Sequence, residues 1–302
     1  MMQLSERLAP DGSLTIFLFH GVIEAQRHRV RNYTRKHLPA VEFRAMMEEV
    51  GRKGHALSMD DVAGICRSGQ PFPKGAFAVT FDDGFENNLT IARPILDHLG
   101  IPAMVYVTSR FIDENGMSWI DRVEYCLEAV RSGQLQLPWS PAPSTFANDQ
   151  DKIALLNDIR RHVKSTPSLN VDAFVGDIFR QLDCEEVHAS DDQLDRKMTW
   201  DQVRSWPAGG FLVGGHSHTH AILSFLRPAG LRHEIETSLS MLKTNAGLAT
   251  SHYSYPEGLA HCFSEDVIKE LKAHDIVCCP TAIDGINPPG TDPFHLRRVM
   301  VN

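Results

Sequence analysis

Short apolar runs alternate with longer amphipathic stretches along the chain. The first apolar runs, each of strand length, cover residues 14–19, 76–81 and 103–107. Between them, apolar residues at helical spacing predict helices over residues 41–52 and 87–99, and Gly100 ends the second of these. The order strand, helix, strand, helix is typical of a mainly parallel sheet that is covered by helices.

The same alternation resumes in the C-terminal third. Further strands are expected over residues 211–213, 252–255, 276–279 and 296–301, and further helices over residues 200–205, 228–245 and 263–274. In a chain of 302 residues, this repeat favours an α/β fold of the (β/α) barrel type over an open sheet.

One long stretch, residues 121–197, interrupts the alternation. It is polar, contains four prolines and has the pattern of loops with helices. We interpret it as an insertion into a single domain that covers residues 1–302, rather than as a second domain.

Composition and charge restrict the class of protein. Hydrophobic residues make up 42% of the chain, enough for a large core, and the net charge of −8 argues against a nucleic-acid partner. No apolar stretch reaches the roughly 18–20 residues of a membrane span, and the first residues lack the pattern of a secretory signal. The six cysteines are scattered without a Cys-x-x-Cys pair, so we expect reduced thiols in a cytoplasmic protein.

Two adjacent carboxylates, Asp82 and Asp83, directly follow the apolar run 76–81. Catalytic residues of α/β folds gather at strand ends, and two neighbouring carboxylates repel each other unless a positive charge lies between them. A metal ion supplies that charge, so that one carboxylate can ligate while the other accepts a proton from water. The alternative is an ordinary Asp-Asp-Gly turn, in which Gly84 permits the sharp bend.

Three histidines, His216, His218 and His220, follow the next candidate strand within five residues. His216 and His220 share one face if this segment is helical, whereas His216 and His218 share one if it is extended. The alternative is a hydrated polar loop that binds no metal. Two imidazoles and one carboxylate leave coordination positions open for water, which is typical of a catalytic rather than a structural metal site, and indicates a metal-assisted hydrolase.

These two motifs resemble those of the polysaccharide deacetylases, the NodB-homology type of carbohydrate esterase. Residues 80–84 read T-F-D-D-G, and residues 216–220 read H-S-H-T-H with Leu223 after them. The resemblance covers about residues 14–110 and 198–302. It implies Asp82 as general base, Asp83 with His216 and His220 as metal ligands, and a distorted (β/α) barrel of about seven parallel strands.

A third motif of the family, R-x-P-Y-G, is matched incompletely by residues 253–258. Ser254 stands where the family has the arginine that orients the catalytic aspartate. The resemblance implies Arg298, in the segment Leu-Arg-Arg-Val, as the replacement partner of Asp82; a salt bridge without a catalytic role is the alternative. In the same motif, Tyr255 and Glu257 are expected to contact substrate, and the backbone N–H near Glu257 to hold the oxyanion.

The general-acid histidine of the family lies in an L-x-H motif near the C-terminus. Here the matching Leu18-Phe19-His20 lies at the end of the first strand. The chain therefore resembles a circularly permuted form of the family, with His20 as general acid; a hydrogen-bonded structural histidine is the alternative. Trp119 of a Trp-x-Asp segment is expected to stack on a sugar ring, or else to fill the core.

The expected function is metal-dependent removal of an N-acetyl or other N-acyl group from an amino sugar. Zn²⁺ is the expected ion, with Co²⁺, Mn²⁺ and Ni²⁺ as alternatives. The expected substrate is a nucleotide- or lipid-linked intermediate of surface polysaccharide synthesis, with peripheral contact to a lipid-linked form. The basic segment 26–37 either faces the phosphate of such a substrate or is a solvated loop.

Two other functions stay open at this point. One is an amidase or deformylase of the same fold that acts on a different C–N bond. The other is a metal-stabilised sugar-binding module without activity. The sequence does not predict an oligomeric state.

Overall fold

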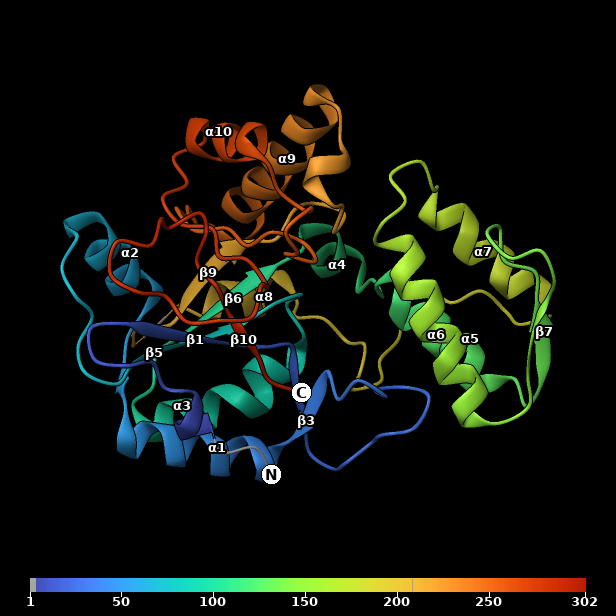
Figure 1. Ribbon diagram of the computed structural model, residues 1–302, viewed down its shortest axis with the longest axis horizontal. Coiled ribbons are helices and arrows are strands. Elements are labelled where there is room, and N and C mark those ends of the chain that lie inside the picture. Colours follow the sequence, from blue (N-terminus) through green and yellow to red (C-terminus); the bar gives the residue numbers. More distant parts are fainter. Residues whose placement is uncertain (1–3, 208) are drawn as a thin grey trace.

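The computed structural model describes residues 4–207 and 209–302 of the chain. Its central sheet contains the strands β1 (Leu14–Phe19), β4 (His55–Ala56), β5 (Ala76–Phe81), β6 (Ala103–Val107), β9 (Leu212–Gly215) and β10 (Val299–Met300). All of its pairings are parallel, in the order β10-β1-β5-β6-β9, with β4 paired to β5 beside this path. The expected parallel α/β fold is therefore confirmed, and Figure 1 shows this sheet inside a layer of helices.

The helices of the sheet-bearing part connect successive strands. They are α1 (Ala40–Lys53), α2 (Met59–Ser68), α3 (Arg93–Leu99), α4 (Ser109–Glu114), α8 (Trp200–Ser205), α9 (Pro228–Ala246) and α10 (Glu265–Ala273). Shorter elements are the 3-10 helices η1 (Leu4–Arg7) and η3 (Leu223–Phe225), the π-helix η2 (Asn88–Ala92), and the paired strands β2 (Gly21–Ile23) and β3 (His37–Pro39). None of the helices in the described part of the chain combines the length and the apolar character that crossing a membrane requires.

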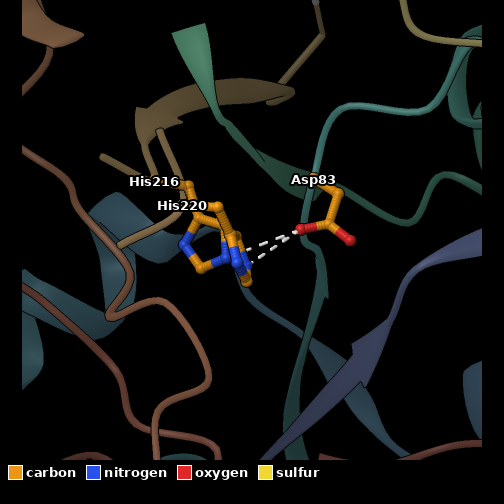
Figure 2. A group of neighbouring side chains, drawn as sticks. All are labelled: Asp83, His216 and His220. Carbon is orange, nitrogen blue, oxygen red and sulfur yellow. Dashed lines mark ion pairs between the residues drawn. The ribbon is translucent and has the colours of Figure 1, made fainter. Parts of the chain in front are cut away.

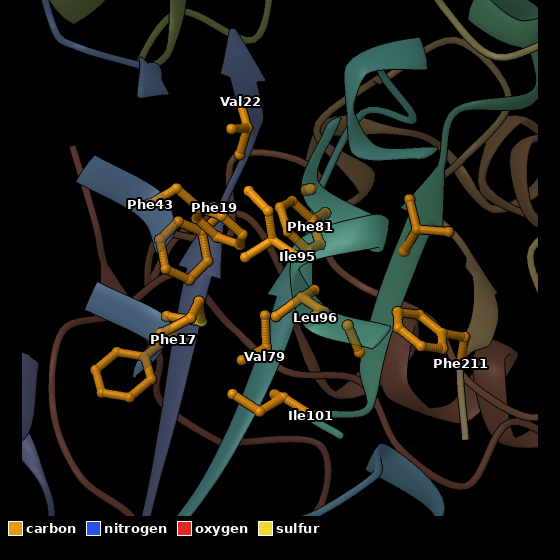
Figure 3. Close-up of a cluster of buried hydrophobic side chains, with 14 of the residues drawn as sticks. Phe17, Phe19, Val22, Phe43, Val79, Phe81, Ile95, Leu96, Ile101 and Phe211 are labelled. Atoms are coloured by element: carbon orange, nitrogen blue, oxygen red, sulfur yellow. The ribbon is translucent and has the colours of Figure 1, made fainter. Parts of the chain in front are cut away.

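Both faces of the sheet are buried, as in other parallel sheets. On one face, Phe17, Phe19 and Phe81 pack against Phe43 of α1 and Leu96 of α3 (Figure 3). The Phe19 and Phe43 rings meet edge to face with centroids 5.2 Å apart. The other face packs in a second cluster with the intervening strand residues, including Ile16, Ala78 and Met104.

The strands predicted over 14–19, 76–81 and 103–107 are confirmed to the residue. The strands expected over 252–255 and 276–279 are wrong: these segments make only the isolated bridges Gly215–Tyr253 and His252–Cys278. Pro256 and Pro280 follow directly and lack the N–H that a longer ladder needs. The helix expected over 87–99 is a π-helix followed by α3.

The insertion forms its own lobe at the side of the sheet (Figure 1). It contains α5 (Trp119–Ala129), the antiparallel pair β7 (Gly133–Leu135) and β8 (Ser144–Phe146), α6 (Asp149–Val163) and α7 (Val171–Gln181). Its helices pack around a separate apolar cluster that includes Val123, Leu156 and Phe179. The lobe therefore has a core of its own and lies beside the edge of the sheet where β6 ends.

Replacing Phe43 with Ala is expected to lower the free energy of unfolding by about 3–5 kcal/mol, because the change leaves a cavity between α1 and the sheet. Val41→Ala on the same helix is the matched control, since Val41 is 72% exposed, and its effect should stay within about 0.5 kcal/mol. Urea unfolding curves measure both. Equal losses in the two variants would contradict this packing.

Candidate metal centre and catalytic pocket

Five of the predicted site residues follow three separate strands of the sheet. Asp82 and Asp83 follow β5, His216 and His220 follow β9, and His20 follows β1. Because these strands run in parallel, their carboxyl ends meet at one edge of the sheet.

Asp83, His216 and His220 form a cluster in which one ligand atom of each lies within 4.8 Å of the others (Figure 2). Asp83 Oδ1 is 3.4 Å from His220 Nε2 and 3.8 Å from His216 Nε2. The same oxygen is buried and has no hydrogen-bond partner. An orphaned carboxylate oxygen that faces two imidazole nitrogens fits a divalent cation, because a metal would satisfy all three atoms.

His216 is oriented by the backbone of the third motif. Its Nδ1 lies 2.9 Å from the carbonyl oxygen of Ser254, so Nδ1–H donates there and Nε2 keeps its lone pair toward Asp83. Burial lowers the pKa of His216 below its ordinary value, and the nearby carboxylate of Asp82 opposes this shift. A neutral imidazole is the form that ligates metals.

His218 of the same motif points elsewhere. Its Nδ1 lies 2.9 Å from the hydroxyl of Ser109, and its backbone N–H donates to the buried carboxylate of Glu234. Of the two histidine pairs that the sequence left open, the structure brings His216 and His220 to Asp83.

Asp82 is held by Arg298 in a bidentate pair. Two guanidinium nitrogens donate to the two Asp82 oxygens, each at 2.8 Å, and both side chains are buried. Ser254 Oγ accepts from the same guanidinium at 2.9 Å. Burial alone would raise the pKa of Asp82, but the charges of Arg298 and His216 lower it below its ordinary value.

Backbone strain gathers around this edge of the sheet. Asp83, Ser217, His220 and Glu257 all have positive φ, between +61° and +75°. Side chains with a Cβ rarely adopt this region, and such residues cluster at functional sites. Gly84, with φ +74°, continues the turn, and a Cβ there would come within 2.8 Å of Ile112.

The cluster opens into a pocket of about 190 Å³ whose lining includes His20, Trp119 and Glu257. His20 therefore lines the same pocket as Asp83, His216 and His220. Burial lowers its pKa to about 4, and the charge of Asp83 opposes the shift. The imidazole is neutral near pH 7 in this state, so it must gain a proton before it can deliver one.

A larger cavity of about 500 Å³ lies between α4, η3 and the insertion. Trp119, Lys164, His220 and Glu257 line both cavities, so the two spaces adjoin. The Lys164 ammonium, at the end of α6, pairs with the Glu257 carboxylate at this boundary. Phe111 and Phe225 contribute aromatic surface to the larger cavity.

Tyr255 is not available to a substrate, contrary to the expectation. Its side chain is fully buried, its ring stacks on Phe263 at 4.6 Å, and its hydroxyl donates to the carbonyl of Phe294. Side chains of an extended segment alternate in direction, and here Ser254, not Tyr255, faces Arg298.

Each Arg and Lys side chain of the basic segment 26–37 is paired with a carboxylate. Its pairs are Arg27–Asp192, Arg29–Asp149, Arg31–Asp195, Arg35–Glu42 and Lys36 with both Asp83 and Asp121. Most of these carboxylates belong to the insertion. The segment therefore links the insertion to the sheet-bearing part of the chain.

The roles of Lys36, Ser254 and Lys164 in this region were not predicted from the sequence. Lys36 lies among other cations in the basic segment, and Lys164 lies in the insertion, so neither stands out by position. The role of Ser254 could have been predicted. Where the motif lacks its arginine, another residue must fill the space of that side chain and pair with the catalytic aspartate.

Comparison with known families gives one sequence match. The family described as polysaccharide deacetylase matches residues 69–278. The matched range includes Asp82, Asp83, His216 and His220, whereas His20 and Arg298 lie outside it. No curated protein sequence is significantly similar to this chain.

Solved structures of similar fold are deacetylases by their descriptions. The Streptococcus pyogenes deacetylase PplD in complex with acetate is 13% identical, with 96% of this chain and 92% of that one covered and a TM-score of 0.61. IcaB from Ammonifex degensii is 17% identical, with 97% and 92% covered and a TM-score of 0.61. The BpsB deacetylase domain from Bordetella bronchiseptica is 16% identical, with 97% and 98% covered and a TM-score of 0.57.

Replacing Arg298 with Met is expected to lower the free energy of unfolding by about 3–5 kcal/mol at pH 7, because it leaves the Asp82 carboxylate buried without its partner. The pKa of Asp82 is lowered in the fold, so this contribution is present above the ordinary aspartate pKa and is lost as the pH falls. The difference between variant and wild type should therefore shrink in acid.

Arg7→Met is the matched control for Arg298→Met. Arg7 pairs with Asp284 at the same 2.8 Å, but the two side chains are 42% and 71% exposed. Its loss should cost about 1 kcal/mol or less. Urea unfolding from pH 7 down to about pH 2.5, below the ordinary aspartate pKa, measures both variants. A similar cost for the two at pH 7 would refute the special role of burial.

Proposed function

The chain belongs to the polysaccharide deacetylase family, whose members are hydrolases, and we propose that it removes the N-acetyl group of an amino sugar with the help of a divalent cation. The observation that carries this proposal is the Asp83–His216–His220 cluster, in which a buried oxygen without a partner faces two imidazoles. The neighbouring Asp82 carboxylate, fixed by Arg298, supplies a base at the same site.

Asp83, His216 and His220 would hold the cation. Zn²⁺ suits two imidazoles and one carboxylate, and Co²⁺, Mn²⁺ and Ni²⁺ are accepted by similar ligands. When bound, such an ion polarises an amide carbonyl and lowers the pKa of water.

Asp82 is suited to accept the proton of the attacking water. Its Oδ2 lies 3.9 Å from His216 Nε2, so it borders the space that the three ligands face. Arg298 keeps the carboxylate ionised and fixes its orientation, because both oxygens accept hydrogen bonds from the rigid guanidinium. A base that is charged and already oriented needs little reorganisation when the water attacks.

His20 is proposed to deliver a proton to the amine that leaves. It lines the same pocket from the end of β1, next to the carboxylates after β5. The parallel pairing of β1 with β10 supports the permuted arrangement, because it makes the first and last strands neighbours. The backbone N–H near Glu257 is proposed to hold the oxyanion, and Trp119 to contact the sugar ring from the pocket wall.

The form of the substrate is a further part of the proposal. Since the cations of segment 26–37 are paired, they give no reason to favour a phosphate-bearing donor. The larger cavity has aromatic side chains, and its Arg110, Arg122 and Lys164 are each paired with a carboxylate. This lining favours an uncharged glycan that extends beyond the N-acyl sugar over the nucleotide- or lipid-linked intermediate.

His220→Ala is expected to lose the metal and the activity together, whereas Asp82→Asn should keep the metal and lose about 10²–10⁴-fold in turnover. His218→Ala is the matched control, since this histidine lies in the same motif but bonds to Ser109. Metal analysis after dialysis and acetate release measure the outcomes. Full activity of Asp82→Asn would remove that residue from the mechanism.

An N-acetylated oligosaccharide is expected to release acetate faster than a UDP-linked or lipid-linked N-acetyl sugar at equal concentration. Acetate release from the oligosaccharide should change little between low and high salt. Salt screens exposed charges, and no exposed charge of the protein is proposed to bind the uncharged oligosaccharide. Faster, salt-sensitive release from the phosphorylated donors would reverse this preference. Formate or ammonia as the product would indicate an amidase or deformylase instead.

A further inference from the structure

The ammonium group of Lys36 lies beside a candidate metal ligand. Its Nζ is 3.3 Å from Asp83 Oδ2, and the side chain, 13% exposed, lines the catalytic pocket. A cation next to a metal site repels the metal, so its presence there lowers the affinity that the ligands could otherwise reach. A buried charge in this position requires a physical reason.

Asp121, at the start of α5 in the insertion, shares the charge of Lys36. Both of its oxygens lie 3.2 Å from Nζ, and Ser118 Oγ donates to one of them at 2.7 Å. Ser118 also caps α5, which fixes Asp121 against the helix N-terminus. Lys36 is therefore held in place by a carboxylate that does not belong to the cluster of ligands.

The two oxygens of Asp83 consequently have different surroundings. Oδ2 faces the Lys36 ammonium, whereas Oδ1 is buried without a hydrogen-bond partner and faces His216 and His220. A carboxylate without such a neighbour can bind a cation through one oxygen or through both. With Oδ2 occupied by an ammonium, Oδ1 alone is directed to the cluster.

We propose that Lys36 is a positioning residue that restricts Asp83 to one ligating oxygen and thereby keeps coordination positions free for water and the substrate carbonyl. This inference rests on the proposed function, since it requires a cation on Asp83, His216 and His220. It assigns the insertion a part in the site, because Asp121 is the residue that keeps Lys36 in place. An open coordination sphere is what separates catalytic from structural sites.

Lys36→Met, which keeps the length of the side chain and removes its charge, is the direct test. The variant is expected to bind Zn²⁺ roughly tenfold or more tightly, because a repelling charge is lost and both Asp83 oxygens become available. Its turnover should nevertheless fall by about tenfold or more, since the extra oxygen occupies a position that water needs. Chelator competition measures affinity, and acetate release measures turnover.

Two further variants separate positioning from charge alone. Asp121→Asn leaves Lys36 with Asp83 as its sole carboxylate partner at this site and is expected to weaken Zn²⁺ binding. Lys197→Met removes another buried ammonium, which lies over the Phe85 ring and donates to the Asp195 carbonyl rather than to Asp83. Its Zn²⁺ affinity and turnover should stay within about twofold of wild type, because no ligand oxygen is released.

The visible spectrum of the Co²⁺-loaded protein gives a readout besides activity. Its bands weaken as the coordination number rises, so Lys36→Met should absorb less strongly than wild type. Weaker Zn²⁺ binding by a folded Lys36→Met or Lys36→Gln variant, unchanged turnover, or equal tightening in Lys197→Met would overturn the inference. Absence of metal binding by the wild-type protein would instead overturn the proposed function.

Discussion

Two adjacent carboxylates buried at the end of β5 are the constraint on which the whole site depends. Asp82 and Asp83 would destabilise the fold if both were charged without cations nearby. The chain supplies a different partner to each: the Arg298 guanidinium closes on both oxygens of Asp82, whereas Lys36 occupies one oxygen of Asp83. The different cations thus also make the two neighbouring carboxylates chemically different. Both oxygens of Asp82 accept hydrogen bonds from a guanidinium, whereas one oxygen of Asp83 has no hydrogen-bond partner.

The parallel sheet explains how these partners reach the same place. Strands β1, β5 and β9 end at one edge, so short loops suffice to bring a histidine or an aspartate there. Arg298 arrives differently, because it precedes β10. Val299 of β10 is paired with Phe17 of β1, which is paired with Val79 of β5. Arg298 therefore starts several residues before the level of Asp82 along the strands. A long side chain is needed to span this distance, and a planar guanidinium is needed to bind both oxygens.

The sequence predicted those parts that local pattern determines. Continuous apolar runs predicted β1, β5 and β6 to the residue, and the resemblance to the polysaccharide deacetylases implied that Asp83, His216 and His220 meet. The predictions from sequence failed where a residue's partners are distant along the chain. The bridges at Tyr253 and Cys278 depend on neighbours far along the chain. No local sequence pattern around Lys36 predicts its contact with Asp121. The positive charge of segment 26–37 is evident in the sequence, but most of the carboxylates that pair with it lie in the insertion.

The left-handed residues around the pocket have a consequence for how the molecule responds to heat. Asp83, Ser217, His220 and Glu257 hold unfavourable backbone angles in the loops around the pocket, and the packed sheet beneath them supplies the stability that maintains this geometry. Loops relax more readily than the strands that carry them. On warming, the loops around the pocket should therefore lose their native conformation while the sheet is still folded, so that loss of activity precedes global unfolding.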